Sequence, residues 1–113
     1  MAKVIKIPSV FVYDTKVVGV SKENADGTSR QDIIKAEVEE DDPMTLEAEP
    51  DNEYDKNAVK VLSRLGRQIG YLNRELAEKI TPALANGAEV HVKASWVNGE
   101  KTVGVGLRIE LVS

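Results

Sequence analysis

The sequence predicts a mainly β, α+β domain: a small, partly open antiparallel β-barrel with two helical inserts. Short segments rich in Val and Ile recur between turn-forming residues. Two further segments have helix caps followed by apolar residues at helical spacing, and the regular strand–helix alternation of a parallel sheet is absent. The 113 residues suit one domain over 1–113, with a core over about 16–112 and an N-terminal strand or arm over 1–14.

Five segments before the C-terminal region predict strands. Residues 3–13 and 16–21 are rich in Val and Ile, and residues 44–49 alternate between apolar and polar side chains. Residues 57–62 and 67–72 have similar apolar patterns and are separated by the loop SRLG. We therefore expect the last two segments to form a hairpin.

Two segments predict helices. The first is expected over about residues 29–38, where either Thr28 or Ser29 can cap the helix because a Gln or Asp follows three residues later. The second is expected over residues 73–87, which begin with Asn and end with Gly. Pro82 lies inside this second segment and could kink the helix or restart it.

The C-terminal region predicts a second hairpin. Asn98-Gly99 is the preferred dipeptide of a two-residue type I′ turn, and it would pair Val97 with Glu100. In that register Ala94 faces Val103. The expected apolar face holds Val90, Val92, Ala94, Trp96, Val103, Val105 and Leu107.

Composition excludes several function classes. There is no cysteine, so disulfides, thiolate metal sites and cysteine nucleophiles are ruled out. No apolar run approaches the roughly 20 residues that span a bilayer. The N-terminus lacks a signal-peptide pattern, so we expect a cytoplasmic protein without membrane partners.

Charge is distributed unevenly along the chain. The formal net charge is -4, which argues against a nonspecific binder of duplex nucleic acid. Residues 37–55 hold ten of the 19 acidic residues and no Lys or Arg, so all 15 basic residues lie elsewhere. Two interpretations stay open: a solvated acidic loop on a mixed surface, or a basic face bordered by an acidic edge that steers an anionic ligand.

The motifs of common catalytic and metal sites are missing. DNEYDKN imitates the start of a calcium loop, but Lys56 replaces the required Gly and Leu62 the required Glu. There is no glycine-rich phosphate loop, G-x-S-x-G or H-E-x-x-H motif. We therefore predict no catalytic residues, metal or cofactor.

Two short motifs suit ligand binding. In EPDNEYDKNAVKVL, residues 49–62, Tyr54 could stack on a nucleobase and Asp55 could accept a hydrogen bond from a terminal hydroxyl. In GTSRQ, Arg30 at a helix N-terminus could bind a phosphate. A structural interpretation stays open for both motifs: Asp55 bracing a turn with Tyr54 packed on the barrel, and Arg30 solvated beside an ordinary helix cap.

These motifs resemble the HIRAN domain family. VVGVS, GTSRQ, EPDNEYDKNAVKV, RQIGYL and NRELAEKITPAL occur in the family's order and at its spacing, over roughly residues 16–86. The resemblance implies a small OB-like or SH3-like β-barrel, of the standalone type known from bacteria and phages. In eukaryotic DNA-remodelling helicases this module holds the 3′ end of single-stranded DNA, with an aspartate of the Tyr-Asp motif on the 3′-hydroxyl.

By position, Asp55 and Tyr54 inherit those roles. The chain departs from the helicase pattern after VVGV, where an arginine and aromatic residues are replaced by Ser21 and Lys22, and Glu53 replaces the proline before the tyrosine. We expect the basic side chains Lys22, Arg30 and Lys56 to neutralise phosphates.

The resulting hypothesis is a non-enzymatic module that binds 3′ ends of single-stranded DNA in repair or replication. The first alternative is a protein-interaction module whose acidic segment, residues 37–55, docks on a larger DNA-processing enzyme. A small nuclease is the second alternative, and it would cleave labelled single strands in the presence of Mg²⁺.

Overall fold

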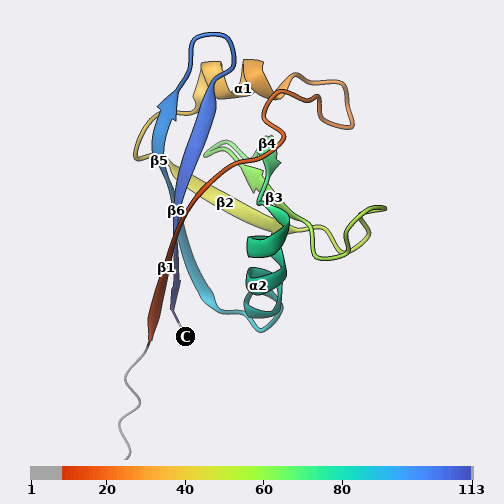
Figure 1. Ribbon diagram of the computed structural model, residues 1–113, viewed down its shortest axis with the longest axis vertical. Coiled ribbons are helices and arrows are strands. Elements are labelled where there is room, and N and C mark those ends of the chain that lie inside the picture. Colours follow the sequence, from red (N-terminus) through yellow and green to blue (C-terminus); the bar gives the residue numbers. More distant parts are fainter. Residues whose placement is uncertain (1–8, 113) are drawn as a thin grey trace, which may run out of the picture.

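The structure is a computed structural model that describes residues 9–112. Its elements confirm a mainly β domain with two helices (Figure 1). In chain order they are β1 (Val10–Lys16), α1 (Arg30–Glu37), β2 (Pro43–Ala48), β3 (Val59–Leu62), β4 (Gln68–Tyr71), α2 (Arg74–Ala85), β5 (Glu89–Asn98) and β6 (Gly104–Val112). None of the helices described is long and apolar enough to cross a membrane.

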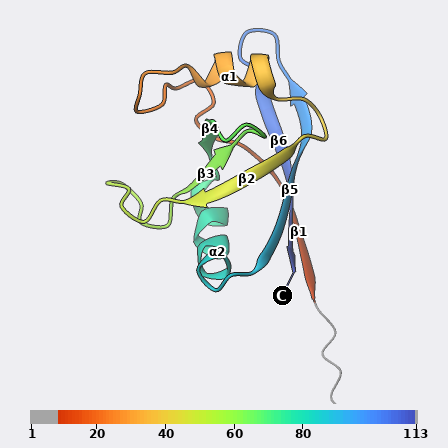
Figure 2. The same ribbon diagram turned by 180° about the vertical axis from the view of Figure 1, so that it is seen from behind.

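The strands form one curled antiparallel sheet in the order β1-β6-β5-β2-β3-β4 (Figures 1 and 2). Just beyond β1, Val18 pairs with Tyr71 of β4 through two backbone hydrogen bonds with N···O distances of 2.9 and 3.0 Å. A Cβ on Gly70 would overlap the Val18 carbonyl, so a glycine is needed for this approach. The bridge joins the two edges of the sheet, and the predicted small, partly open barrel is confirmed.

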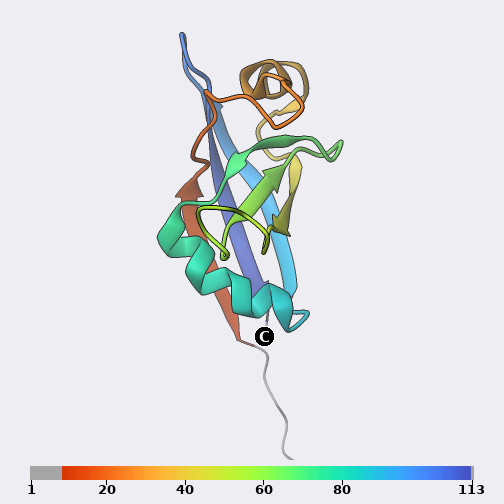
Figure 3. The same cartoon turned by 90° about the vertical axis from the view of Figure 1, so that its right-hand side faces the viewer.

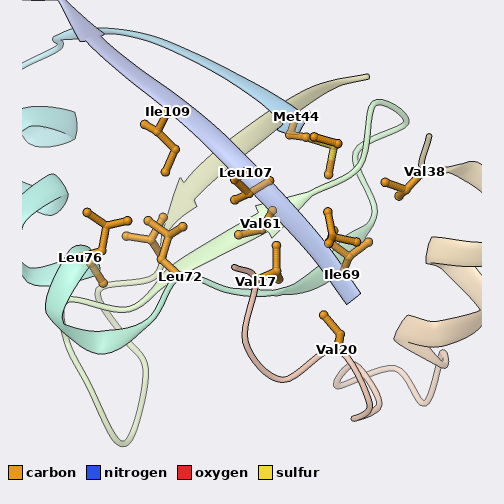
Figure 4. Packing of buried hydrophobic residues seen from close by; sticks show 14 of the residues in the cluster. Val17, Val20, Val38, Met44, Val61, Ile69, Leu72, Leu76, Leu107 and Ile109 are labelled. Atoms are coloured by element: carbon orange, nitrogen blue, oxygen red, sulfur yellow. The ribbon is translucent and has the colours of Figure 1, made fainter. Parts of the chain in front are cut away.

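The hydrophobic core fills the inside of the curled sheet (Figure 4). The core forms because side chains alternate between the two faces of each strand. In β3, Val59 and Val61 point inward and are fully buried, whereas Lys60 between them points outward. Helices α1 and α2 lie at opposite ends of the sheet (Figure 3) and contribute Ile34 and Ile80 to the core. Each such aliphatic side chain stabilises the fold by about 1.5–3 kcal/mol.

Both helices begin at the caps that the sequence offered. Ser29 caps α1, its Oγ accepting from the Asp32 amide over 3.3 Å. Asn73 caps α2, its Oδ1 accepting from the Leu76 amide over 2.9 Å. Pro82 lies inside α2, which continues to Ala85 without restarting. The two predicted helices are therefore confirmed.

The predicted register of the C-terminal hairpin is wrong. Ala94 pairs with Leu107 rather than Val103, and Asn98 pairs with Gly104, so residues 99–103 form a five-residue connection in place of a two-residue turn. The longer connection is anchored outside the hairpin, because the Gln31 side chain of α1 binds both the amide and the carbonyl of Val103, over 2.8 and 3.0 Å.

The predicted place of Trp96 on the apolar face is also wrong. A β-bulge between Ala94 and Trp96 shifts the alternation, so Trp96 pairs with Gly106 on the outer face while Ala94 stays buried. Trp96 is 40% exposed. The remaining residues expected on the apolar face belong to the core or pack against it.

The N-terminal region differs from its prediction as well. One strand, β1, replaces the two strands expected over 3–13 and 16–21, and it pairs along its whole length with β6. Beyond Lys16 the Val17 amide still donates to the Val105 carbonyl over 2.9 Å, and Val18 bridges Tyr71, but no second strand forms. Residues 3–8 of the first predicted strand lie outside the described residues.

Candidate nucleic-acid interface

The loop of residues 49–58 joins β2 to β3 and projects from the barrel (Figures 1 and 2). Its ends are held together because the Glu49 amide donates to the Ala58 carbonyl over 2.8 Å. The Oδ1 atom of Asn52 accepts from the amides of Tyr54 and Asp55, over 2.9 and 3.0 Å. One side-chain amide thus fixes the backbone of the Tyr-Asp pair, as Asn does in tight turns.

Tyr54 and Asp55 occupy different environments. The Tyr54 side chain is 87% exposed, so its ring is not packed on the barrel. Asp55 is half-buried; its Oδ1 accepts from the Asn57 amide over 2.9 Å, and its Oδ2 lies 3.8 Å from Nε of Arg74. One carboxylate oxygen therefore braces the turn, as the structural interpretation expected, while the other faces a basic side chain.

An open cleft of about 290 Å³ lies beside this carboxylate. Its lining is mainly apolar apart from the polar groups of the Tyr-Asp loop and Arg74. The lining residues are Val18, Asn52, Tyr54, Asp55, Ala58, Tyr71, Leu72 and Arg74. The cleft thus combines a stacking ring, a hydrogen-bond acceptor and a cation, which is the chemistry that the end of a nucleic-acid strand requires.

Tyr71 forms the wall of the cleft and is held on two sides. Its hydroxyl donates to Oε1 of Glu49 over 2.9 Å. The Arg30 guanidinium carbon lies 5.4 Å from the centroid of its ring, within cation–π range. Reasoning from the sequence missed Tyr71; the signal was its place opposite Lys60 on the outward face of the predicted hairpin.

Arg30 was predicted to bind phosphate at a helix N-terminus. It is only 6% exposed. Its Nε donates to Oδ1 of Asn24 over 2.7 Å, and one terminal nitrogen donates to the Gly19 carbonyl over 2.9 Å. Arg30 does not line the cleft itself, but it contacts the Tyr71 ring, which does. Its direct contact with phosphate stays a prediction.

The two predicted lysines lie in different places. Lys56 is exposed and lines a neighbouring cleft of about 370 Å³ together with Tyr54, Asp55 and Arg74. Lys22 is exposed on the loop before α1, and its side chain lines neither cleft. This loop projects from the same side of the barrel as residues 49–58 (Figures 1 and 2). The structure therefore brings Tyr54, Asp55 and Lys56 together, and it leaves Lys22 outside both clefts.

Arg74 is a site residue that the sequence reasoning missed. It is the first residue of α2, directly after the Asn73 cap, and its side chain is 80% exposed. A helix that begins straight after β4 places its first side chain beside the Tyr71 wall. The sequence GYLNRE, in which the end of a strand is followed directly by a helix cap, was the signal that could have identified Arg74.

Glu49 connects the loop to the wall of the cleft. Its carboxylate accepts from Nδ2 of Asn52 over 2.6 Å, from the Tyr71 hydroxyl and, over 2.9 Å, from Nζ of Lys60. Burial opposes ionisation, but these hydrogen bonds outweigh it and lower the pKa of Glu49 below its ordinary value of 4.5. The hydrogen bond to Glu49 raises the pKa of Lys60 above 10.5, so the pair is charged at neutral pH.

Half of the acidic residues in the segment 37–55 are paired within the domain. The pairs, with their N···O distances, are Glu37 with Arg67 (3.7 Å), Asp41 with Lys93 (3.5 Å), Asp42 with Arg64 (3.7 Å), Glu49 with Lys60 (2.9 Å) and Asp55 with Arg74 (3.8 Å). Across residues 9–112, no group of three or more His, Asp or Glu residues is arranged to hold a metal ion. The segment is thus less available to a basic partner than its composition implied.

Comparison with curated proteins finds helicase-like transcription factors. The rabbit protein (Oryctolagus cuniculus) is 43% identical over 49 residues, and the mouse and human proteins are 39% identical over 49 residues. Each match covers 43% of this chain and 5% of the relative. The chain therefore corresponds to a small part of these relatives.

Solved structures with the same fold cover nearly the whole chain. The crystal structure of the HIRAN domain of human HLTF has a TM-score of 0.74 at 23% identity, covering 94% of this chain and 79% of that chain. A protein from Lactobacillus plantarum has a TM-score of 0.76 at 16% identity, covering 94% and 98%. The HLTF HIRAN domain in its DNA-bound conformation has a TM-score of 0.62 at 25% identity, covering 94% and 79%.

The sequence motifs, the curled sheet and these neighbours point to the same family. The sequence model of the HIRAN domain family matches residues 10–112, which is almost all of the chain that the structure describes. This chain therefore belongs to the HIRAN domain family.

Proposed function

We propose that this HIRAN domain is a non-catalytic module that binds the 3′ end of single-stranded DNA and serves DNA repair or replication. The observation that carries the proposal is the Asp55 carboxylate, which opens on a cleft between the exposed Tyr54 ring and Arg74. A HIRAN domain of HLTF has been solved in its DNA-bound conformation, which supports DNA as the ligand class.

Each group in the cleft has a distinct part in this proposal. The terminal base stacks on Tyr54, whose ring is free to accept it. The 3′-hydroxyl donates to Asp55 Oδ2, and a terminal phosphate at the same place meets like charge. Arg74 and Lys56 neutralise the phosphates that precede the end.

The two remaining predicted residues act at a greater distance in this proposal. Arg30 orients the Tyr71 wall through the cation–π contact described above. Lys22, on the loop before α1 that projects from the same side of the barrel as residues 49–58, attracts the strand as it approaches.

A comparison of chemical ends tests the proposal. We expect an oligonucleotide with a 3′-hydroxyl to bind at least about tenfold more tightly than the same oligonucleotide with a 3′-phosphate, because a hydrogen bond to a charged group is worth about 1.5–3 kcal/mol. Asp55→Asn retains an oxygen for the Asn57 amide but loses the charge, so it should remove most of that difference. Fluorescence anisotropy measures both affinities.

Asp51→Asn is the matched control, because Asp51 is exposed in the same loop and lines neither the cleft beside Asp55 nor the one beside Lys56. It should preserve the preference for the 3′-hydroxyl. Equal affinity of the original chain for both ends would refute the assigned role of Asp55. A thermal melt of each variant distinguishes lost binding from lost folding.

A further inference from the structure

Trp96, the single tryptophan of the chain, lies flat on the outer face of the barrel. The indole packs on two glycines of β6, Gly104 and Gly106. These glycines lie on the outer face because the residues that alternate with them, Val105 and Leu107, are fully buried in the core. A Cβ on Gly106 would overlap the indole nitrogen and its neighbouring carbons. The ring thus needs the glycine at position 106, whereas a Cβ on Gly104 would lie 3.3 Å from the ring, a tight contact. Trp96 remains 40% exposed.

Lys16 extends this outer surface onto the neighbouring strand. It pairs with Gly106 from the side opposite to Trp96, so the three residues form one row across β5, β6 and β1. The Lys16 ammonium lies 6.0 Å from the centroid of the indole, at the outer limit of a cation–π contact. No ion pair to Lys16 is formed by any residue in the range 9–112.

The row leads to the cleft beside Asp55. Val18 lies two residues after Lys16 on the same outward side, because Val17 between them is buried. Val18 is 42% exposed, bridges Tyr71 and lines the cleft. Two residues of extended chain span about 7 Å. The indole is thus connected to the Tyr71 wall by one exposed side chain after another.

We propose that Trp96 and Lys16 form a second stacking platform, which holds the nucleotides on the 5′ side of the bound 3′ end. A base stacks on the exposed face of the indole, and Lys16 neutralises the adjoining phosphate. This proposal rests on the proposed function, because the platform receives a strand whose end lies in the Asp55 cleft. It explains why an exposed indole lies on a surface reached from that cleft.

Tryptophan fluorescence tests the platform directly, because Trp96 is the only source of that signal. An oligonucleotide of about ten nucleotides, within the roughly 4–16 that OB folds cover, should quench the emission on binding. A dinucleotide with a 3′-hydroxyl should occupy the cleft and leave the emission unchanged. Anisotropy of labelled oligonucleotides, with the dinucleotide as competitor, establishes binding independently of the fluorescence.

Variants supply the second readout. Trp96→Ala should lower the affinity for the ten-nucleotide strand by on the order of tenfold, the effect of removing one stacked base. It should leave the affinity for the dinucleotide unchanged. Trp96→Phe retains a ring and should recover most of the loss. Lys16→Gln should lower the affinity for the longer strand only. Lys35→Gln, at an exposed position in α1, should change the affinity for neither strand.

The outcomes separate this proposal from the one on which it rests. Strands that bind with a preference for a 3′-hydroxyl, without quenching Trp96 and without loss in Trp96→Ala, would overturn the platform and leave the end-binding site in place. Equal losses for both lengths in a folded Trp96→Ala variant would place the indole in the cleft itself and also overturn the platform. If no strand of any length binds, both proposals fail.

Discussion

The Glu49 carboxylate connects three side chains around the cleft, and its ionisation supports their arrangement. Because its pKa in the folded protein is lower than its ordinary value of 4.5, the unfolded chain binds a proton more readily than the folded one. Glu49 therefore contributes stability that is fully present above about pH 4.5 and is lost as the pH falls through its lowered pKa.

We accordingly expect Glu49→Gln to lower the free energy of unfolding at pH 7 and to make its decline below pH 4.5 shallower. The amide keeps the shape of the side chain but cannot attract Lys60 as a charge does. Urea denaturation between pH 7 and pH 3 measures both effects. Glu53→Gln, an exposed change in the same loop, should leave the curve unaltered; parallel curves for Glu49→Gln and the original chain would contradict the role of its ionisation.

Single residues of the candidate site were predictable to different extents. The turn that carries Tyr54 and Asp55 depends on Asn52, two and three residues earlier, so local sequence located it. The surroundings of Arg30 depend on Gly19 and on the distant Tyr71, which no local pattern reveals. A basic residue at a helix N-terminus indicated a phosphate ligand, and that contact stays a prediction; the burial of Arg30 against the Tyr71 ring was not predictable from the local sequence.

Among the elements, the helices followed their local signals and the C-terminal hairpin did not. Ser29 and Asn73 cap helices within three residues of themselves, so tertiary contacts were not needed to find them. Asn98-Gly99 gave an equally local signal for a two-residue turn. It was overridden by a longer connection tied to Gln31, 72 residues away in sequence, and by the bulge that puts Trp96 outside.

The join between the edges of the sheet gives a prediction at this scale. Gly70→Ala places a Cβ against the Val18 carbonyl and a Val17 methyl group, and because one of these is backbone, the bridge must open. We expect a loss of about 1–3 kcal/mol in the free energy of unfolding, typical of overpacking. Hydrogen exchange should show faster exchange of the Val18 and Tyr71 amides, which protect each other across the bridge.

Gly66→Ala is the comparison for this change. A Cβ there meets open space, but φ is 81°, so we expect a smaller loss of about 1 kcal/mol from backbone strain alone. Protection at the bridge should stay intact. If Gly70→Ala kept the protection of Val18 and Tyr71, the bridge would not depend on the missing side chain.

On the scale of the whole molecule, a chain with net charge -4 must bind a polyanion through local rather than overall attraction. The acidic residues of the segment 37–55 that form ion pairs have their charges balanced inside the domain. Around the cleft, Lys56 is exposed, and Arg74, whose side chain is 80% exposed, can contact a phosphate as well as the Asp55 carboxylate 3.8 Å away. This distribution favours a site that contacts few phosphates, and it disfavours an acidic docking surface.

The dependence of binding on salt tests this balance and separates DNA binding from docking on a protein. Each phosphate contacted on a single strand contributes about -0.7 to the slope of log K against log salt. With Lys56 and Arg74 as the cations of the cleft, we expect a slope of about -1.4 for a trinucleotide, whose two phosphates they contact, and about -2.1 for a longer strand that also reaches Lys16. Anisotropy titrations over a range of salt concentrations measure both slopes.

Lys56→Gln should make each slope less negative by about 0.7, since it removes one phosphate contact. Lys35→Gln should leave both slopes unchanged. A slope of zero with retained affinity would mean that bases alone hold the strand and that the cations have no part. Failure to detect any binding at low salt would favour the protein-interaction alternative, because electrostatic attraction to a nucleic acid is strongest under those conditions.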